Sequence, residues 1–130
     1  GGSGGSIIIN SSINGLVGLP ANIAYTTSKG AVRLLAKSVA VHCARTKTNI
    51  RCNSVHPGII DTPIIRRTVA DTPDPAASLA YLGNISPLGR LGQVEEVAAL
   101  VSFLASGESS LINGAELVAD GGTTAGLVGV

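Results

Sequence analysis

Apolar residues gather in separate segments along the chain, and the spacing within each segment predicts its secondary structure. Ile7 to Ile9 form a short β-branched run between glycine/serine and asparagine/serine, which predicts a fully buried strand. From about residue 24 to residue 44, apolar side chains return at helical spacing, which predicts one long helix with a wide apolar face, buried on more than one side. The next stretch, "IRCNSVHPG", predicts a second strand that is stopped by Pro57 and Gly58.

The rest of the chain predicts an excursion, a helix and a strand. Residues 59–84 carry several prolines and no clean periodicity, which predicts a long excursion with broken helices. Residues 92–106, "GQVEEVAALVSFLAS", have helical spacing and place Glu95 and Glu96 in the first turn, where the helix dipole favours anions. Residues 112–122, "INGAELVADGG", predict a turn, a strand and a glycine-rich end.

This order of strands and helices is typical of an α/β fold, in which right-handed crossovers join parallel strands. In such sheets, ligands bind beyond the carboxyl ends of the strands. The loops after those ends contain Ser11–Ser12, Pro57–Gly58 and Asp120–Gly121. We therefore expect a ligand site where these loops meet, beside the start of the long helix near Tyr25.

Composition narrows the class of protein. The 130 residues are 45% hydrophobic and 13% charged, with a net charge of +1, which favours one globular domain over a disordered chain. The sequence has neither the basic stripe with aromatic platforms of a nucleic-acid binder nor an apolar run long enough for a membrane helix. Cys43 and Cys52 lack the spacing of metal ligands, so we expect no metal site and two buried, reduced thiols in a cytoplasmic protein.

Tyr25 and Lys29 stand four positions apart at the start of the long helix, so their side chains share one helix face. A phenol is too weak an acid to supply a base at neutral pH, but a lysine ammonium about 4 Å away favours the phenolate. Ser12, on the neighbouring loop, offers a hydroxyl that could hold an oxygen between itself and the phenol. Such a group suits proton exchange with an alcohol or carbonyl oxygen. The alternatives are a plain pair on a solvated helix face and a serine that only satisfies the loop backbone.

Several stretches of the sequence, in order, resemble blocks of the short-chain dehydrogenase/reductase family. They cover nearly the whole chain: "NSSINGLVGLPANIAYTTSKGAVRLLAKSVAVHCA", "IRCNSVHPGIIDTP", "PLGRLGQVEEVAALVSFLAS" and "INGAELVADGGTTA". The first block holds Ser12, Tyr25 and Lys29 in the pattern of the family's Ser…Tyr-x-x-x-Lys signature. The blocks are most similar to bacterial members that act on secondary alcohols, cyclic alcohols and hydroxysteroids.

The resemblance implies a role for each residue of the signature. Tyr25 would exchange a proton with the substrate oxygen, Lys29 would favour the phenolate and bind the nicotinamide ribose, and Ser12 would bond the substrate oxygen. The cofactor would be NAD or NADP, in contact with Tyr25, Lys29, Pro57, Gly58, Ile60 and Thr62. The substrate would lie against Ser12, Ile13, Asn14 and Tyr25, with residues 64–84 as a lid.

The resemblance also implies an incomplete fold, the C-terminal half of a Rossmann-like, doubly wound parallel sheet with three strands and crossover helices. The family's glycine-rich phosphate-binding turn and its Asn-Asn-Ala-Gly block have no counterpart in the sequence. We therefore expect residues 1–130 to be a single partial domain from a larger protein, with residues 1–6 as a Gly/Ser-rich lead-in.

Two functions stay open from the sequence. The first is an NAD(P)(H)-dependent oxidoreductase that interconverts a small secondary alcohol and a ketone by hydride transfer, once the nucleotide-binding half is supplied. The second is a non-catalytic fragment that acts as an oligomerisation module. An apolar edge strand without a partner invites pairing with another chain, so we expect a homo-oligomer, a dimer or a tetramer. Nucleic acid and membranes are not expected partners.

Overall fold

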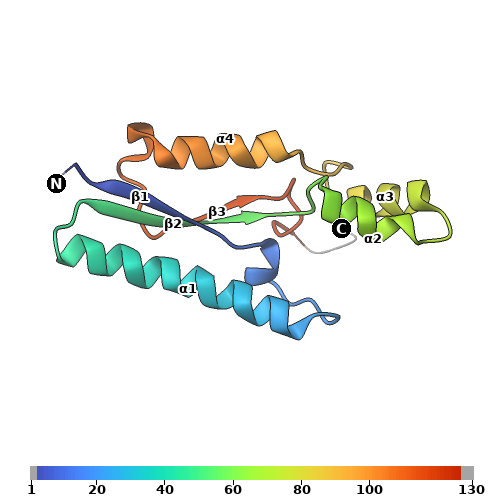
Figure 1. Cartoon of the computed structure of the whole chain (residues 1–130), viewed down its shortest axis with the longest axis horizontal. Helices are drawn as coiled ribbons and strands as arrows, with labels where there is room; N and C mark the ends of the chain where they lie inside the picture. Colours follow the sequence, from blue (N-terminus) through green and yellow to red (C-terminus); the bar gives the residue numbers. More distant parts are fainter. Residues whose placement is uncertain (1–2, 127–130) are drawn as a thin grey trace.

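Strands and helices alternate along the chain in the computed structural model, which describes residues 3–126 (Figure 1). The strands are β1 (Gly5–Asn10), β2 (Ile50–Pro57) and β3 (Glu116–Ala119). The helices are α1 (Ile23–Arg45), α2 (Pro63–Ala70), α3 (Pro75–Asn84) and α4 (Val94–Ala105), with short 3-10 turns η1 (Ile13–Gly15) and η2 (Gly107–Ser109). The long helix, the strand after it and the broken helices of residues 59–84 are confirmed.

Within residues 3–126 the strands form one parallel sheet in the order β1-β2-β3. The central strand β2 pairs Asn53 with Ile8 of β1 and His56 with Val118 of β3. Each connection between neighbouring strands contains a helix, because parallel strands need a long crossover. The predicted parallel α/β sheet with crossover helices is therefore confirmed.

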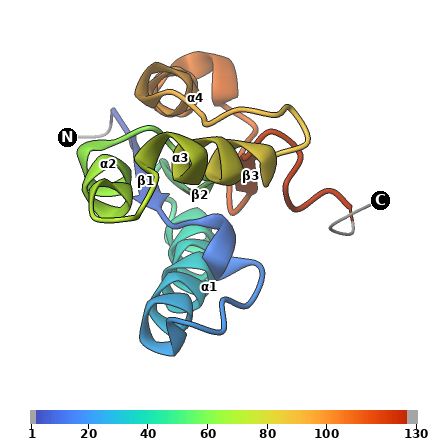
Figure 2. The same ribbon diagram turned by 90° about the vertical axis from the view of Figure 1, so that its right-hand side faces the viewer.

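Helices cover both faces of this sheet. Figure 1 shows α1 below the strands and α4 above them, and the end-on view of Figure 2 shows the same separation into layers. In both views α2 and α3 lie beyond the carboxyl ends of the strands. Ala36 and Ala40 of α1 pack against Cys52 of β2, and Leu104 of α4 is fully buried. Small side chains on α1 let the helix approach the sheet closely, which positions its N-terminal turns at the ligand edge.

Side chains at the helix starts explain where the helices begin. Asn22 caps α1, with its Oδ1 accepting a hydrogen bond from the Tyr25 N–H at 3.1 Å. Pro63 and Pro75 stand in the first turns of α2 and α3, where a missing N–H costs nothing. Pro75 also separates α3 from α2, so this part of the chain forms two short helices rather than one long helix.

Two predictions about burial are wrong. Ile7 to Ile9 were predicted to be fully buried, yet β1 is an edge strand and Ile7 is 41% exposed. The long helix was predicted to be buried on more than one side, yet Leu34, Leu35 and Val41 of α1 are exposed. β1 pairs with β2 along one edge only, and α1 packs on the sheet with one face only. No other element of residues 3–126 covers the outer edge of β1 or the outer face of α1.

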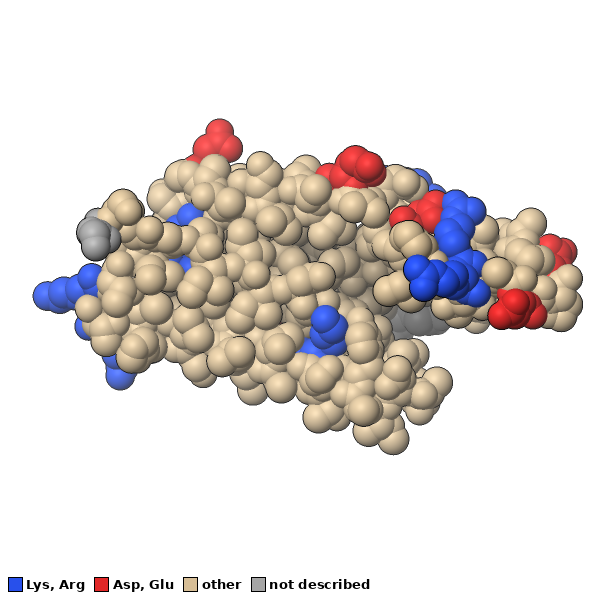
Figure 3. All heavy atoms as spheres, in the orientation of Figure 1, with Lys and Arg blue, Asp and Glu red and all other residues tan. Residues whose placement is uncertain are grey.

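On the face drawn in Figure 3, Lys/Arg and Asp/Glu side chains lie side by side at the right-hand end, whereas Lys/Arg side chains protrude at the left-hand end. The middle of that face is mostly uncharged. Among the described helices, none combines the length and the apolar character needed to span a membrane.

Candidate active site

Ser12 lies directly beyond the end of β1, where it is buried and begins the η1 turn. Its backbone is extended, and its Oγ accepts a hydrogen bond from the Asn14 N–H at 3.1 Å. The Ser12 hydroxyl donates to Asn14 Oδ1 across a long 3.3 Å contact. Because this second bond is weak and made to a side chain, the hydroxyl can turn toward a ligand oxygen without breaking the turn.

Tyr25 and Lys29 lie in the first turns of α1 with their side chains next to each other. The Lys29 Nζ is 5.6 Å from the centroid of the Tyr25 ring, within the range of a cation–π contact. The same Nζ donates to the carbonyl oxygen of Asn10, the last residue of β1, at 3.1 Å. Tyr25 is 39% exposed, so its phenol is open to a ligand. The end of β1 therefore holds the Lys29 ammonium beside the Tyr25 ring.

The η1 turn packs directly on the backbone of α1 and so fixes Ser12 relative to Tyr25. The buried Ser11 hydroxyl donates to the Lys29 carbonyl oxygen at 2.9 Å. Gly15 approaches so closely that an added Cβ would lie 2.5 Å from Ser11 Oγ and 2.7 Å from Lys29 O. Only glycine fits this position, because a side chain would separate the turn from the helix.

A hollow of about 250 Å³ lies between the η1 turn, α1 and the segment after β2, and we refer to it as the Ser12–Tyr25 hollow. Its volume is close to the lower end of the range for small-ligand sites, about 300–1,000 Å³. Most of the predicted site residues line it: Ser12, Ile13, Asn14, Tyr25, Gly58, Ile60 and Thr62. The topology thus brings together residues that stand as much as fifty positions apart in the sequence.

Two predicted site residues lie beside the hollow rather than in its walls. Lys29 is one turn along α1 from Tyr25 and makes its contacts with the ring of that tyrosine and with Asn10. Pro57 is the last residue of β2 and immediately precedes Gly58, which does line the hollow. Lys29 and Pro57 therefore lie next to residues that line the hollow but do not line it themselves.

Sequence reasoning missed part of the apolar wall. Ile59 lines the Ser12–Tyr25 hollow but was not predicted, although its place between two predicted residues in "PGII" is a signal that could have found it. Ile64 and Ile65, in the first turn of α2, also line the hollow. Only the start of the predicted lid, residues 64–84, therefore borders this site.

The donor set fits the nicotinamide end of NAD or NADP. The hydroxyls of Ser12, Tyr25 and Thr62 and the nearby Lys29 ammonium can pair with an amide and with ribose hydroxyls. The isoleucine walls suit a flat, weakly polar ring. Among the described residues that line the hollow none is basic, so the fit extends to the nicotinamide and its ribose and not to the pyrophosphate.

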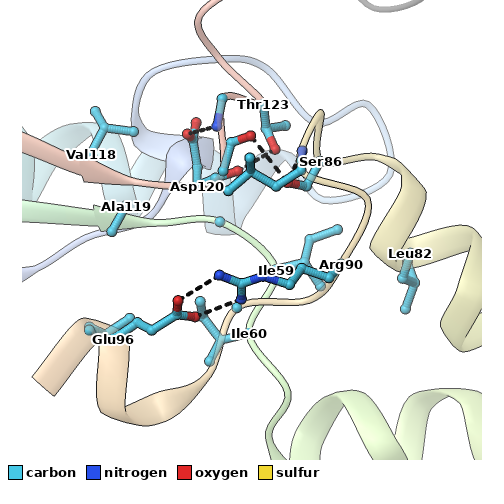
Figure 4. A pocket seen from close by; sticks show the side chains of 16 residues that line it. Ile59, Ile60, Leu82, Ser86, Arg90, Glu96, Val118, Ala119, Asp120 and Thr123 are labelled. Carbon is cyan, nitrogen blue, oxygen red and sulfur yellow. Dashed lines mark hydrogen bonds and ion pairs between the residues drawn. The ribbon is translucent and has the colours of Figure 1, made fainter.

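The third loop predicted at the ligand edge borders a second hollow of about 270 Å³, shown in Figure 4, which shares Gly58, Ile59 and Ile60 with the Ser12–Tyr25 hollow. Burial raises the pKa of Asp120, but hydrogen bonds from Thr124 and Gly122 outweigh burial and hold that pKa below its usual value. Arg90 and Glu96 pair with each other across the opposite wall, as the dashed lines in Figure 4 mark. The charged groups drawn there already have partners within the described residues, so the candidate site is the Ser12–Tyr25 hollow.

Comparison with known proteins defines the family. The family model described as "Enoyl-(Acyl carrier protein) reductase" matches residues 2–124. Cyclopentanol dehydrogenase of Comamonas sp. (strain NCIMB 9872) is 51% identical over 121 residues, which are 93% of this chain and 46% of that protein. NADP-dependent (R)-specific alcohol dehydrogenase of Lentilactobacillus kefiri is 44% identical over 124 residues, which are 95% of this chain and 47% of that protein. The ligand-free structure of Thermoplasma acidophilum aldohexose dehydrogenase matches with a TM-score of 0.87 and 37% identity, over 95% of this chain and 49% of that chain.

The chain therefore belongs to the short-chain dehydrogenase/reductase family, and its parallel sheet has the Rossmann-like fold of that family. The family expected from the sequence blocks is confirmed. The chain spans about half the length of the curated relatives it matches.

Proposed function

We propose that this chain carries the catalytic side of an NAD(P)(H)-dependent oxidoreductase that interconverts a secondary alcohol and a ketone, with Tyr25 as the acid/base. The observation that carries the proposal is the convergence of Ser12 and Tyr25 on one hollow, beside an ammonium anchored on the Asn10 carbonyl oxygen. Because the chain spans about half of its curated relatives, the proposal includes further polypeptide that completes the cofactor site, in the same chain or in another.

The chemistry divides between the cofactor and the residues of this chain. Nicotinamide, when bound, accepts or supplies the hydride at the carbinol carbon. In the oxidation direction, Tyr25 Oη takes up the hydroxyl proton of the alcohol, and in reduction it returns a proton to the ketone oxygen. The Lys29 ammonium lies beside the Tyr25 ring, where it can bind the ribose hydroxyls of the cofactor, and the Ser12 hydroxyl donates to the substrate oxygen as charge develops on it.

The walls of the Ser12–Tyr25 hollow support a weakly polar substrate body with one reacting oxygen. Ile13, Ile59 and Ile64 line the hollow together with Ser12 and Tyr25. The names of the relatives, which include a cyclopentanol and an (R)-specific alcohol dehydrogenase, support cyclic and other secondary alcohols, with hydroxysteroid-like rings as larger members of that class. We also propose a reducing, cytoplasmic location, which the buried free thiols of Cys43 and Cys52 support.

Paired tyrosine variants test the proposal. We expect the wild-type protein, together with the polypeptide that completes its cofactor site, to oxidise a cyclic secondary alcohol with NAD or NADP. The Tyr25→Phe variant should lose about 10²- to 10⁴-fold in kcat, since general acid–base catalysis supplies about that much. Tyr81→Phe is the matched control, because Tyr81 is exposed on α3 and does not line the hollow. A Tyr25→Phe variant that turns over at the wild-type rate, or a wild-type protein that binds cofactor without turnover, would contradict the proposal.

A second function, association with further copies of the chain, is favoured by one specific observation. Leu34, Leu35 and Val41 form an exposed apolar surface on α1, and Leu34 is 63% exposed. We expect a dimer or a tetramer in sedimentation velocity, which the Leu34→Ser variant weakens. Ser110→Ala, at an exposed position outside α1, is the control. A monomer at every concentration would exclude this function.

A further inference from the structure

His56 is a fully buried polar side chain beside the candidate site, although it lines neither hollow. It lies on β2 immediately before Pro57. Side chains alternate along a strand, so His56 points to the same face of the sheet as Cys52, which packs against α1. Burying an imidazole costs free energy unless both of its nitrogens form hydrogen bonds. The hydrogen-bond partners of His56 therefore indicate its role.

Both ring nitrogens of His56 have a partner in the interior. Nδ1 lies 2.8 Å from the backbone carbonyl oxygen of Ser12, and Nε2 lies 2.8 Å from Ser54 Oγ. A carbonyl oxygen can only accept, so the proton must be on Nδ1, which donates to Ser12. In the neutral ring, Nε2 then accepts from the Ser54 hydroxyl. The partners thus fix both the orientation and the tautomer of the ring.

The bond from His56 reaches the backbone of the proposed catalytic serine. The Ser12 carbonyl oxygen accepts two hydrogen bonds, from His56 Nδ1 at 2.8 Å and from the Gly15 N–H at 3.0 Å. The second bond closes the η1 turn on itself, whereas the first ties that turn to the central strand, 44 residues away in the sequence. With its carbonyl held at this point, the Ser12 side chain is directed into the Ser12–Tyr25 hollow.

We propose that His56 is a positioning residue for the reaction, which it serves by holding the Ser12 backbone so that Ser12 Oγ faces the substrate oxygen. This inference rests on the proposed oxidoreductase function. His56 is well placed for it because β2 ends at Pro57, directly after His56, and the next residue, Gly58, lines the hollow. The His56 side chain therefore connects the turn that holds Ser12 to the strand that leads to Gly58.

Amide and aliphatic variants separate positioning from packing. In His56→Asn, the amide nitrogen stands near the place of Nδ1 and can still donate to the Ser12 carbonyl oxygen. In His56→Gln, the amide reaches the place of Nε2 and meets Ser54 instead. His56→Leu fills the volume without a donor. Ser54→Ala is the control that removes the partner of Nε2 and leaves the bond to Ser12 intact.

The kinetic measurement compares kcat and KM of these variants. We expect His56→Gln and His56→Leu to lose about 10- to 100-fold in kcat with little change in KM, because small displacements of a catalytic group have effects of that size. His56→Asn and Ser54→Ala should stay within about threefold of the wild-type kcat. Equal losses in His56→Asn and His56→Gln, or an undiminished kcat in a folded His56→Leu variant, would overturn the positioning role.

Amide hydrogen exchange supplies a readout that needs no turnover. The Asn14 N–H donates to Ser12 Oγ, whereas the Ser11 N–H donates to the Val55 carbonyl oxygen in the extension of the sheet. We expect His56→Leu to speed exchange at Asn14 about tenfold or more while Ser11 stays within about twofold, because only the turn is released. Equal acceleration at both amides would mean that His56 acts as general packing and would overturn the inference. A wild-type protein without turnover would count against the proposed function, and the exchange ratio would still decide the role of His56.

Discussion

Gly15 is the position where the smallest change should disturb the candidate site most. The Cβ of a Gly15→Ala variant would lie 2.7 Å from the Lys29 carbonyl oxygen, whereas ordinary contact begins at 3.4 Å. The Ser11 hydroxyl, 2.5 Å from the same point, is held by its bond to Lys29 and cannot leave without losing it. The η1 turn must therefore move away from α1 by roughly 0.7 Å, since neither neighbour is a flexible side-chain end.

The size of the effect follows from opposing contributions. Overpacking a close contact costs about 1–3 kcal/mol, and a lost Ser11–Lys29 hydrogen bond adds about 0.5–1.5 kcal/mol. A Gly→Ala change also restricts the unfolded chain, which stabilises the fold by about 0.4–1 kcal/mol. We expect Gly15→Ala to lower the free energy of unfolding by about 0.5–4 kcal/mol.

Urea unfolding measures this change, and Gly18→Ala in the same loop is the matched control. A Cβ at Gly18 meets nothing within 4 Å, so this variant should stay within about 0.5 kcal/mol of the wild type. The NMR shifts of Ser12 and Tyr25 should move in Gly15→Ala and stay in place in Gly18→Ala. Equal stability of the two variants, with unchanged shifts in both, would refute the close packing of the turn on α1.

Two further predictions concern ion pairs. Hydrogen bonding to Arg90 lowers the pKa of Glu96 to about 2 from an ordinary value of 4.5, so the pair's stabilisation is present above about pH 4.5 and is lost as pH falls toward 2. In thermal melts across this range, the wild type should lose stability relative to the Glu96→Gln variant, and parallel curves would contradict the pairing. Glu116 of β3 pairs with Arg33 and Lys37 of α1, so Glu116→Gln should lower the free energy of unfolding by about 1 kcal/mol at low salt. The loss should shrink in high salt, and a loss that does not depend on salt would count against an ionic origin.

The parts of the fold that could be predicted from the sequence are those whose signals are local. The period of apolar residues defined α1, and Pro57–Gly58 defined the end of β2, because periodicity and backbone restriction act within a few residues. Burial was predicted less well. Ile7 to Ile9 and Leu34 carry the composition of a core, but whether another element covers them is a property of the whole assembly.

In the candidate site, too, local signals could be predicted from the sequence and contacts between distant residues could not. Tyr25 and Lys29 could be paired from their spacing alone, and the order of elements placed Ser12 near them. The contacts that hold these side chains were not predictable, since Lys29 is bound by a backbone carbonyl oxygen of β1 and Ser12 is tied to His56. Every residue carries a backbone carbonyl oxygen, so the sequence does not indicate which of them accept side-chain hydrogen bonds. A histidine within a strand is first interpreted as a core residue.

The most direct test of the central claim follows an isotope from substrate to cofactor. The protein is incubated with a cyclic secondary alcohol deuterated at the carbinol carbon and with NAD or NADP, and the cofactor is examined by mass spectrometry. We expect one deuterium on the nicotinamide for each ketone formed, because the hydride leaves the carbon while Tyr25 takes the hydroxyl proton. A protein that binds the cofactor and the alcohol but transfers no deuterium would contradict it.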